Sequence, residues 1–306
     1  MRVIGGLWTR AREFGRAIGD GVVDSGHAAL YLRQLLRGNR GAPSIRRSGP
    51  VGPAGSVGGD GGLAPPASEI AKPRPEPASA AAGHPKSVDA ETPVLLLHGY
   101  LATRGSVHLL ERRLTELGHV VMTYRLGPVQ MGDIRQSAGF IAGKVDSLIA
   151  QTGVQKVDIV AHSMGGLVAL DYLKRLNGHA RIRRLILLGT PVQGTWSALM
   201  GLLTVPLGQA TVQLLPGSAF LRELAARPIP PGPEVITIAG ERDWLAPPST
   251  TRLAGARHGR AATSHSGLLV DEQIARRVSD LLRGPPTDPG ERAESLGEFD
   301  ASRDTI

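Results

Sequence analysis

The middle of the chain alternates short apolar runs with longer segments whose apolar residues recur at helical spacing. The apolar runs have the length of buried strands, and the clearest three are PVLLLHG (93–99), KVDIVAH (156–162) and EVITIAG (234–240). The clearest helical segment carries one apolar stripe, made of Ile134, Ala138, Ile141, Val145 and Leu148. Continuous apolar strands alternating with helices are typical of a parallel sheet covered by helices on both faces. The predicted fold class is therefore α/β with a mostly parallel sheet, and functional groups are expected at the carboxyl ends of its strands.

Composition changes on both sides of this alternating region. Residues 38–91 are dominated by Gly, Pro, Ala and Ser and hold almost no large apolar side chains. Such a segment cannot offset its ordering entropy by burial, so it is predicted to be a disordered linker. Residues 285–306 have the same character with an acidic bias and are predicted to be a disordered tail. One folded domain is predicted for residues 92–284, a length sufficient for a sizeable core.

Residues 1–37 are predicted to form an amphipathic helical segment, because apolar residues recur at helical spacing with arginines elsewhere on the wheel. Two interpretations stay open: helices that pack on the main domain or a partner, and a basic helix lying on a membrane surface. Neither a convincing signal peptide nor an apolar run long enough for a membrane span is found. A cytoplasmic protein is therefore expected, with peripheral membrane contact as the alternative.

The formal net charge is +8, but no dense Lys/Arg run is interleaved with aromatic residues. Nucleic acid is therefore not an expected partner. The chain has no cysteine, which excludes disulfides, cysteine nucleophiles and thiolate metal sites.

Ser163 lies in the stretch DIVAHSMGGLVAL (158–170), directly after a predicted strand and before a predicted helix. This is the context of a nucleophile elbow, where a sharp turn requires small neighbours and projects the hydroxyl above the sheet. Ala161 stands where the G-x-S-x-G pattern has its first glycine, and alanine is the next smallest residue. Because the helix starts at the serine, the backbone N–H of Met164 is predicted to help hold an oxyanion. The alternative is a serine that only caps the helix.

A nucleophilic serine requires a histidine base and a carboxylate that orients it, and in this type of fold both follow the serine in the chain. Asp243 comes directly after the strand-like run 234–240 and is the predicted acid, with Glu241 as its close rival. His265 precedes the final helical segment and is the predicted base. The other candidate, His258, lies in a basic stretch that reads as exposed.

The second oxyanion donor is expected from the loop after the first strand. The backbone N–H of Tyr100 or of Leu101 follows that strand and can face the elbow.

Five stretches together resemble the bacterial lipase branch of the α/β-hydrolases and the wider group of lipases and GPI inositol deacylase-like proteins. They are VLLLHGYLAT, DIVAHSMGGLVAL, LILLGTPVQGT, LLPGSAFLREL and IAGERDWLAPP. The resemblance covers residues 92–284, which it implies are an α/β-hydrolase domain, and none of the first 90 residues. It implies Ser163, Asp243 and His265 as the catalytic triad, with no cofactor and no metal. The sequence departs from the pattern at Val192 and Gln193, where polar residues are frequent.

The segment at about 193–233 lies between two predicted strands and is rich in leucine, with Gly and Pro breaking it into short helices. It is predicted to be a small helical cap insertion. A cap could form an apolar wall over the serine, suited to an acyl chain. The alternative is that these helices only cover the sheet.

The predicted function is a serine carboxylic-ester hydrolase of the triacylglycerol lipase or esterase type, acting through an acyl-enzyme on small-molecule ester or lipid substrates. An acyltransferase or thioesterase with the same triad is one alternative, because the acceptor cannot be read from the motifs. A catalytically silent binding protein, tethered to a membrane through residues 1–37, is the other.

Overall fold

The computed structural model describes residues 92–99, 104–123, 132–198, 208–284 and 298–299. The helical segment predicted at 1–37 and the linker predicted at 38–91 lie outside these residues. The tail predicted at 285–306 also lies outside them, except for positions 298 and 299.

The described residues form one seven-stranded sheet with the order β2-β1-β3-β4-β5-β6-β7, in which every neighbouring pair is parallel. Its strands are β1 (Val94–Leu97), β2 (Val121–Thr123), β3 (Val157–His162), β4 (Ile182–Leu188), β5 (Glu234–Gly240), β6 (Arg257–Ala261) and β7 (Glu298–Phe299). The parallel sheet predicted from the apolar runs is confirmed. The two-residue strand β7 comes from the segment predicted as a tail and pairs with β6.

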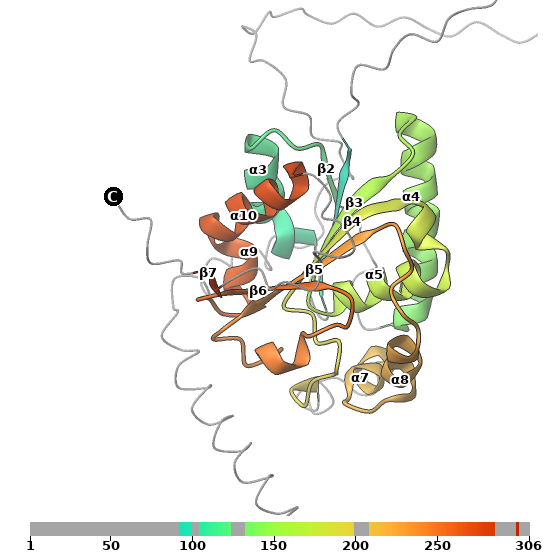
Figure 1. The fold of residues 1–306 in the computed structure, drawn as a ribbon, viewed down its shortest axis with the longest axis vertical. Coiled ribbons are helices and arrows are strands. Elements are labelled where there is room, and N and C mark those ends of the chain that lie inside the picture. The colour runs from blue at the N-terminus through green and yellow to red at the C-terminus, as the bar shows by residue number, and fades with distance from the viewer. Residues whose placement is uncertain (1–91, 100–103, 124–131, 199–207, 285–297, 300–306) are drawn as a thin grey trace, which may run out of the picture. The chain divides into compact units, whose positions relative to one another are not determined.

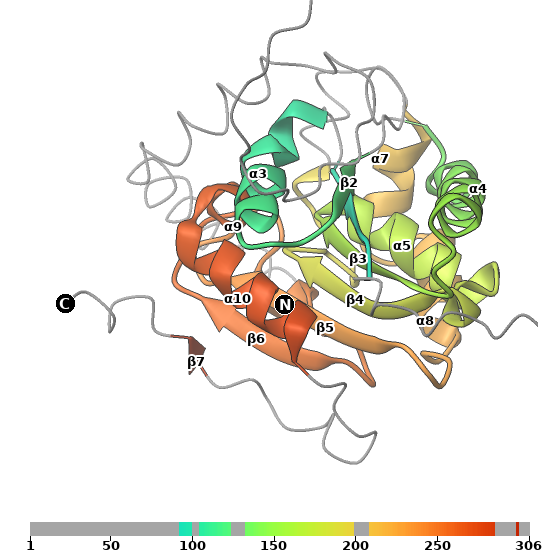
Figure 2. The same cartoon turned by 90° about the horizontal axis from the view of Figure 1, so that it is seen from above.

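Helices cover both faces of the sheet (Figures 1 and 2). Helices α3, α9 and α10 pack on one face, and α4 and α5 pack on the other. The α-helices are α3 (His108–Glu116), α4 (Ile134–Thr152), α5 (Met164–Arg175), α7 (Gln209–Leu214), α8 (Ala219–Ala226), α9 (Gly267–Val270) and α10 (Glu272–Arg283). Short 3₁₀ turns are η1 (Arg104–Val107), η2 (Gly178–Ala180) and η3 (Pro248–Thr250).

Successive residues of the strands alternate between the two halves of the core. In β1, Val94 and Leu96 belong to the cluster on the α3 and α10 side, whereas Leu95 and Leu97 belong to the cluster on the α4 and α5 side. All four side chains are at most 1% exposed. Because both faces are buried, the strand reads as a continuous apolar run rather than as an alternating one.

Helix α4 has the single apolar stripe that its sequence predicts. The Asp133 side chain accepts a hydrogen bond from the Arg135 backbone N–H at 2.8 Å and caps the amino end. Gly153 ends the helix with a φ of 72°, the left-handed conformation that favours glycine. The five residues predicted to form the apolar stripe are all buried: Ile134, Ala138, Ile141, Val145 and Leu148.

The described part of the insertion at 193–233 contains α7 and α8, which pack against α4 and α5. The Gln213 side chain of α7 accepts a hydrogen bond from the Ile134 N–H at 2.9 Å, at the start of α4. Lys174 of α5 donates to the Leu224 carbonyl of α8 at 3.2 Å. Through these contacts, α7 and α8 cover part of helices α4 and α5. Residues 199–207, on which an apolar wall over the serine depends, lie outside the described residues.

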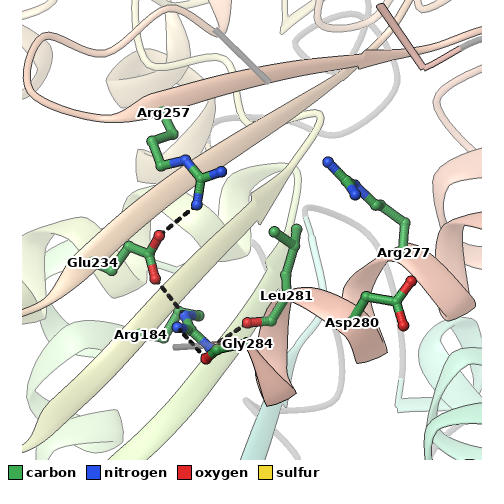
Figure 3. Close-up of a pocket in the computed structure, with 7 residues that line it drawn as sticks. All are labelled: Arg184, Glu234, Arg257, Arg277, Asp280, Leu281 and Gly284. Atoms are coloured by element: carbon green, nitrogen blue, oxygen red, sulfur yellow. Dashed lines mark hydrogen bonds and ion pairs between the residues drawn. The ribbon is translucent and has the colours of Figure 1, made fainter. Parts of the chain in front are cut away.

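Charged side chains form an ionic network at the amino ends of β4, β5 and β6, and they line a pocket there (Figure 3). Arg184 of β4 donates to Glu234 of β5 at 2.7 Å, and both side chains are 1% exposed. Arg257 of β6 donates to the other oxygen of the same carboxylate, also at 2.7 Å. Arg184 also donates to the carbonyls of Leu281 and Gly284 at the end of α10. The guanidinium therefore satisfies carbonyls that a helix terminus leaves unpaired.

Candidate active site

Ser163 occupies the turn between β3 and α5. Its backbone has φ 56° and ψ −131°, a conformation that residues other than glycine rarely adopt. The Ser163 N–H donates to the Leu188 carbonyl of β4 at 2.9 Å, which ties the turn to the neighbouring strand. The side chain makes no capping hydrogen bond to α5. Ser163 therefore occupies the N-cap position of α5 without capping the helix through its hydroxyl.

Glycines allow the end of β1 to pack directly against this turn. A Cβ atom on Gly99 would lie 2.8 Å from the Ser163 Cβ and 3.2 Å from its Oγ. A Cβ atom on Gly165 would lie 2.5 Å from the His98 carbonyl oxygen. The separations of 2.8 Å from the Ser163 Cβ and 2.5 Å from the His98 carbonyl oxygen are shorter than a side-chain carbon tolerates. These two positions therefore require glycine.

Asp243 and His265 form a close pair. The His265 Nδ1 lies 2.6 Å from the Asp243 Oδ2, and the Asp243 side chain is fully buried. The other carboxylate oxygen, Oδ1, accepts a hydrogen bond from the Ala246 N–H at 2.7 Å. Since an ionised carboxylate only accepts, the imidazole hydrogen lies on Nδ1 in the neutral ring, which leaves Nε2 as an acceptor.

The two rival residues lie elsewhere. Glu241 is exposed on the loop after β5, whereas Asp243 points inward. His258 belongs to β6, where its Nδ1 lies 2.7 Å from the Thr237 hydroxyl of β5 and burial lowers its pKa. The basic stretch is therefore only partly exposed, which corrects its interpretation as an exposed segment. Pairing with β5 satisfies its backbone, and Arg257 and His258 bond to Glu234 and Thr237 of β5, whereas Arg260 is exposed.

Gly189 was not singled out from the sequence, and the structure gives it a clear position. It follows β4 with a φ of 55°, and a Cβ atom there would lie 2.9 Å from the Asp243 Oδ2 and 3.2 Å from the His265 Nδ1. The only signal in the sequence is a glycine directly after a strand, which is too common to be specific.

His162 was also not singled out, although it directly precedes Ser163. Its ring centroid lies 4.4 Å from that of His265. This contact brings the loop after β6 to the elbow after β3. His98, at the end of β1, is a second buried imidazole near His162, and burial lowers its pKa.

Met164 is the first residue of α5 and is fully buried. Backbone N–H groups in the first turn of a helix lack partners within the helix, so α5 itself gives the Met164 N–H no acceptor. The other predicted donors, Tyr100 and Leu101, lie outside the described residues.

All described residues of this site lie at the carboxyl edge of the sheet, on strands that are neighbours in space. The edge runs through β1, β3, β4, β5 and β6 in that order. Among the described residues, no three His, Asp or Glu side chains group closely enough to hold a metal ion. Within the same ranges, no helix combines the length and apolar character that crossing a membrane requires.

Several solved structures share this fold at low sequence identity. Lipase B of Aspergillus fumigatus matches with a TM-score of 0.56 and 16% identity, over 67% of this chain and 55% of that one. A mature lipase of Bacillus licheniformis matches with 0.54 and 19%, over 65% and 94%. A phospholipase of Legionella pneumophila matches with 0.55 and 16%, over 64% and 59%. The likeness shows the fold, and this chain spans only a little more than half of the first and third proteins.

A family model gives the more specific match. The model described as the alpha/beta hydrolase family matches residues 94–301, about two thirds of the chain. The matched region begins at β1 and includes β7, so it takes in the whole described sheet. The resemblance inferred from the motifs is confirmed at the level of fold and family. The chain belongs to the α/β-hydrolase family.

Proposed function

We propose that this protein is a serine hydrolase of carboxylic esters, of the lipase or esterase type, with Ser163 as nucleophile, His265 as base and Asp243 as the group that orients the base. The observation that carries this proposal is the 2.6 Å bond between Asp243 and His265 beside the strained turn of Ser163. A strained serine on a strand-to-helix turn, with a carboxylate-bound histidine on neighbouring strand ends, is the arrangement that acyl transfer through serine requires.

In the acylation step, the His265 Nε2 takes the Ser163 hydroxyl proton as Oγ attacks the ester carbonyl carbon. The C–O π bond breaks and a tetrahedral oxyanion forms. Its collapse expels the alcohol, which receives the proton from His265, and leaves an acyl group on Ser163. A water molecule, deprotonated by the same imidazole, then releases the carboxylic acid and restores the serine.

Two backbone groups are proposed to hold the oxyanion: the N–H of Met164, and the N–H of Tyr100 or Leu101. Donors placed before the reaction stabilise developing charge without reorganising, so they lower the barrier in both steps. Asp243 stabilises the imidazolium that forms in each step, and its burial makes that interaction stronger than it would be in water.

The proposed substrates are esters or lipids with an apolar acyl part. The names of the structural neighbours support this class, because two are lipases and one is a phospholipase. No cofactor or metal is needed for the proposed reaction.

The test is hydrolysis of a p-nitrophenyl ester series from short to long acyl chains, by the full chain and by Ser163→Ala. We expect the substitution to lower kcat/KM by at least about 10³-fold, because loss of a triad member typically costs that much. A fluorophosphonate probe gives an independent readout: Oγ displaces fluoride from phosphorus and becomes covalently labelled. A loss of less than about tenfold in Ser163→Ala would sink the assignment.

The same measurements separate the alternative functions. Serine-dependent labelling without ester hydrolysis would favour one of the two enzyme alternatives. Acyl transfer to an added alcohol or thiol would identify an acyltransferase, and hydrolysis of an acyl thioester would identify a thioesterase. Absence of both labelling and turnover would favour the silent binding protein. Liposome sedimentation of the full chain beside a version lacking residues 1–37 tests the membrane contact, which fails if both sediment equally.

A further inference from the structure

His162 lies between the proposed nucleophile and the proposed base. It is the last residue of β3 and directly precedes Ser163. Its side chain is 3% exposed, and its ring lies against the His265 ring with a centroid distance of 4.4 Å and an interplanar angle of 51°. The contact joins residues 103 positions apart in the chain.

A hydrogen bond defines the tautomer of this ring. The His162 Nε2 lies 3.0 Å from the backbone carbonyl oxygen of His265. A carbonyl oxygen can only accept, so Nε2 carries the hydrogen and donates it. The His162 Nδ1 is then an acceptor, and it is buried without a hydrogen-bond partner in the structure. The ring therefore has one polar contact, and that contact holds the backbone of His265.

The surroundings keep this imidazole neutral. Burial, with the nearby His265 and His98 rings adding to it, lowers the pKa of His162 well below its ordinary value. When His265 accepts a proton during the proposed reaction, its neighbour at 4.4 Å therefore stays uncharged. A neutral ring can support the base in both of its protonation states.

We propose that His162 is a positioning residue for His265, which holds the backbone of the proposed base through Nε2–H and supports its ring by packing. This inference rests on the proposed function. His265 then has two anchors: Asp243 fixes Nδ1, and His162 fixes the main chain. Because His162 is bonded to Ser163 in the chain, the second anchor also ties the base to the nucleophile.

The competing explanation is that His162 only fills space in the core. An apolar side chain of similar size would then serve equally well. Three substitutions separate the two explanations. His162→Gln keeps an amide N–H at about the reach of Nε2, His162→Leu fills the space without a donor, and His162→Asn carries an amide that is too short to reach the carbonyl.

The experiment measures kcat and KM on a p-nitrophenyl ester, the rate of fluorophosphonate labelling and the thermal midpoint for the full chain and each variant. It also records the downfield proton NMR resonance of His265 Nδ1–H, which reports the bond to Asp243. We expect His162→Leu and His162→Asn to lower kcat by about 10- to 100-fold with KM nearly unchanged, since small misplacements of a catalytic group have effects of this size. We expect His162→Gln to stay close to the wild type and to keep the downfield resonance.

Equal activity of the Leu and Gln variants, whether both are high or both low, would overturn the positioning role. If His162→Leu does not fold, the comparison of Gln with Asn decides in the same way. If the wild type hydrolyses the ester and is labelled, and Ser163→Ala loses both, the proposed function stands, so failure of the His162 prediction alone is then distinguishable. No labelling of the wild type overturns both proposals.

Discussion

At the scale of single residues, the candidate site holds conformations and buried groups that are unfavourable by themselves. The backbone of Ser163 is in a region that costs a non-glycine residue about 1–3 kcal/mol. The His98 Nε2 and the His162 Nδ1 are buried without hydrogen-bond partners in the structure, and each such group costs about 1–3 kcal/mol. Strained and unsatisfied groups persist only where the surrounding structure holds them. The strained Ser163 backbone and the two unsatisfied imidazole nitrogens lie together at the candidate active site.

The strain at Ser163 predicts that glycine is more stable than alanine at this position. Ser163→Gly and Ser163→Ala both remove the hydroxyl, but only glycine adopts a φ of 56° without strain. We expect the Gly variant to have a free energy of unfolding about 1 kcal/mol above that of the Ala variant, after the extra chain entropy of glycine is allowed for. Urea unfolding of the two variants measures the difference. A Gly variant less stable than the Ala variant would show that the turn carries no strain.

At the scale of elements, the first turn of helix α5 packs closely against the ends of strands β1 and β4. Ten of its side-chain positions, Met164 through Leu173, are buried. Its first turn carries Gly165 and Gly166, which face the ends of β1 and β4. The start of the helix, and with it the N–H of Met164, is therefore placed by contacts that have no room for a side chain.

This close packing predicts the effect of a methyl group at Gly166. A Cβ atom there would lie 2.0 Å from the Thr190 Oγ1 and 2.8 Å from the Thr190 Cβ, so the helix or the segment after β4 must shift. We expect Gly166→Ala to lower the free energy of unfolding by about 1–3 kcal/mol, as overpacking does.

The matched control is Gly143→Ala in α4, where a Cβ atom would meet nothing within 4 Å. Alanine has the higher helix propensity, so this control is expected to raise stability by about 0.5–1 kcal/mol. Denaturant unfolding of both variants measures the contrast. Two changes of the same sign would contradict the packing argument.

At the scale of the whole molecule, buried polar contacts join the helices of one face to the sheet. Arg183 of β4 donates to Asp158 of β3 and to the Leu282 carbonyl of α10. His119, in the turn before β2, lies 2.8 Å from the Ser279 hydroxyl of α10. Burial, together with the positive charges of nearby arginines, lowers the pKa of His119 to about 4. The folded molecule therefore needs this histidine neutral.

The pKa of His119 predicts how stability depends on pH. Between about pH 6.5 and pH 4 the unfolded chain binds a proton at His119 that the folded chain does not, so stability falls as pH falls through this window. We expect His119→Gln, which can still contact Ser279, to make the free energy of unfolding less dependent on pH. Its slope against pH should fall by an amount equivalent to up to about one bound proton. Urea unfolding from pH 8 to pH 4.5 for both proteins measures the slopes. Identical slopes would contradict the assignment.

The sequence by itself determined the local features of this protein. The alternation of apolar runs and helical stripes predicted the α/β fold, because buried strands and amphipathic helices each impose a short-range pattern. The elbow at Ser163 was predicted for the same reason: a sharp strand-to-helix turn requires small residues within a few positions. The family match and the sheet confirm the fold.

Only the tertiary structure decided which side chains meet. Asp243 and His265 are 22 positions apart, and His162 is 103 positions from His265. Their contacts depend on the order in which β3, β4, β5 and β6 pair, and on which residue of a loop turns inward. Glu241 and His258 have the same chemistry as their rivals in the sequence, and they differ only in where the backbone directs them. The contact of His162 with His265 leaves no pattern in the sequence, because it joins the end of β3 to the loop after β6, and these meet only when the sheet has formed.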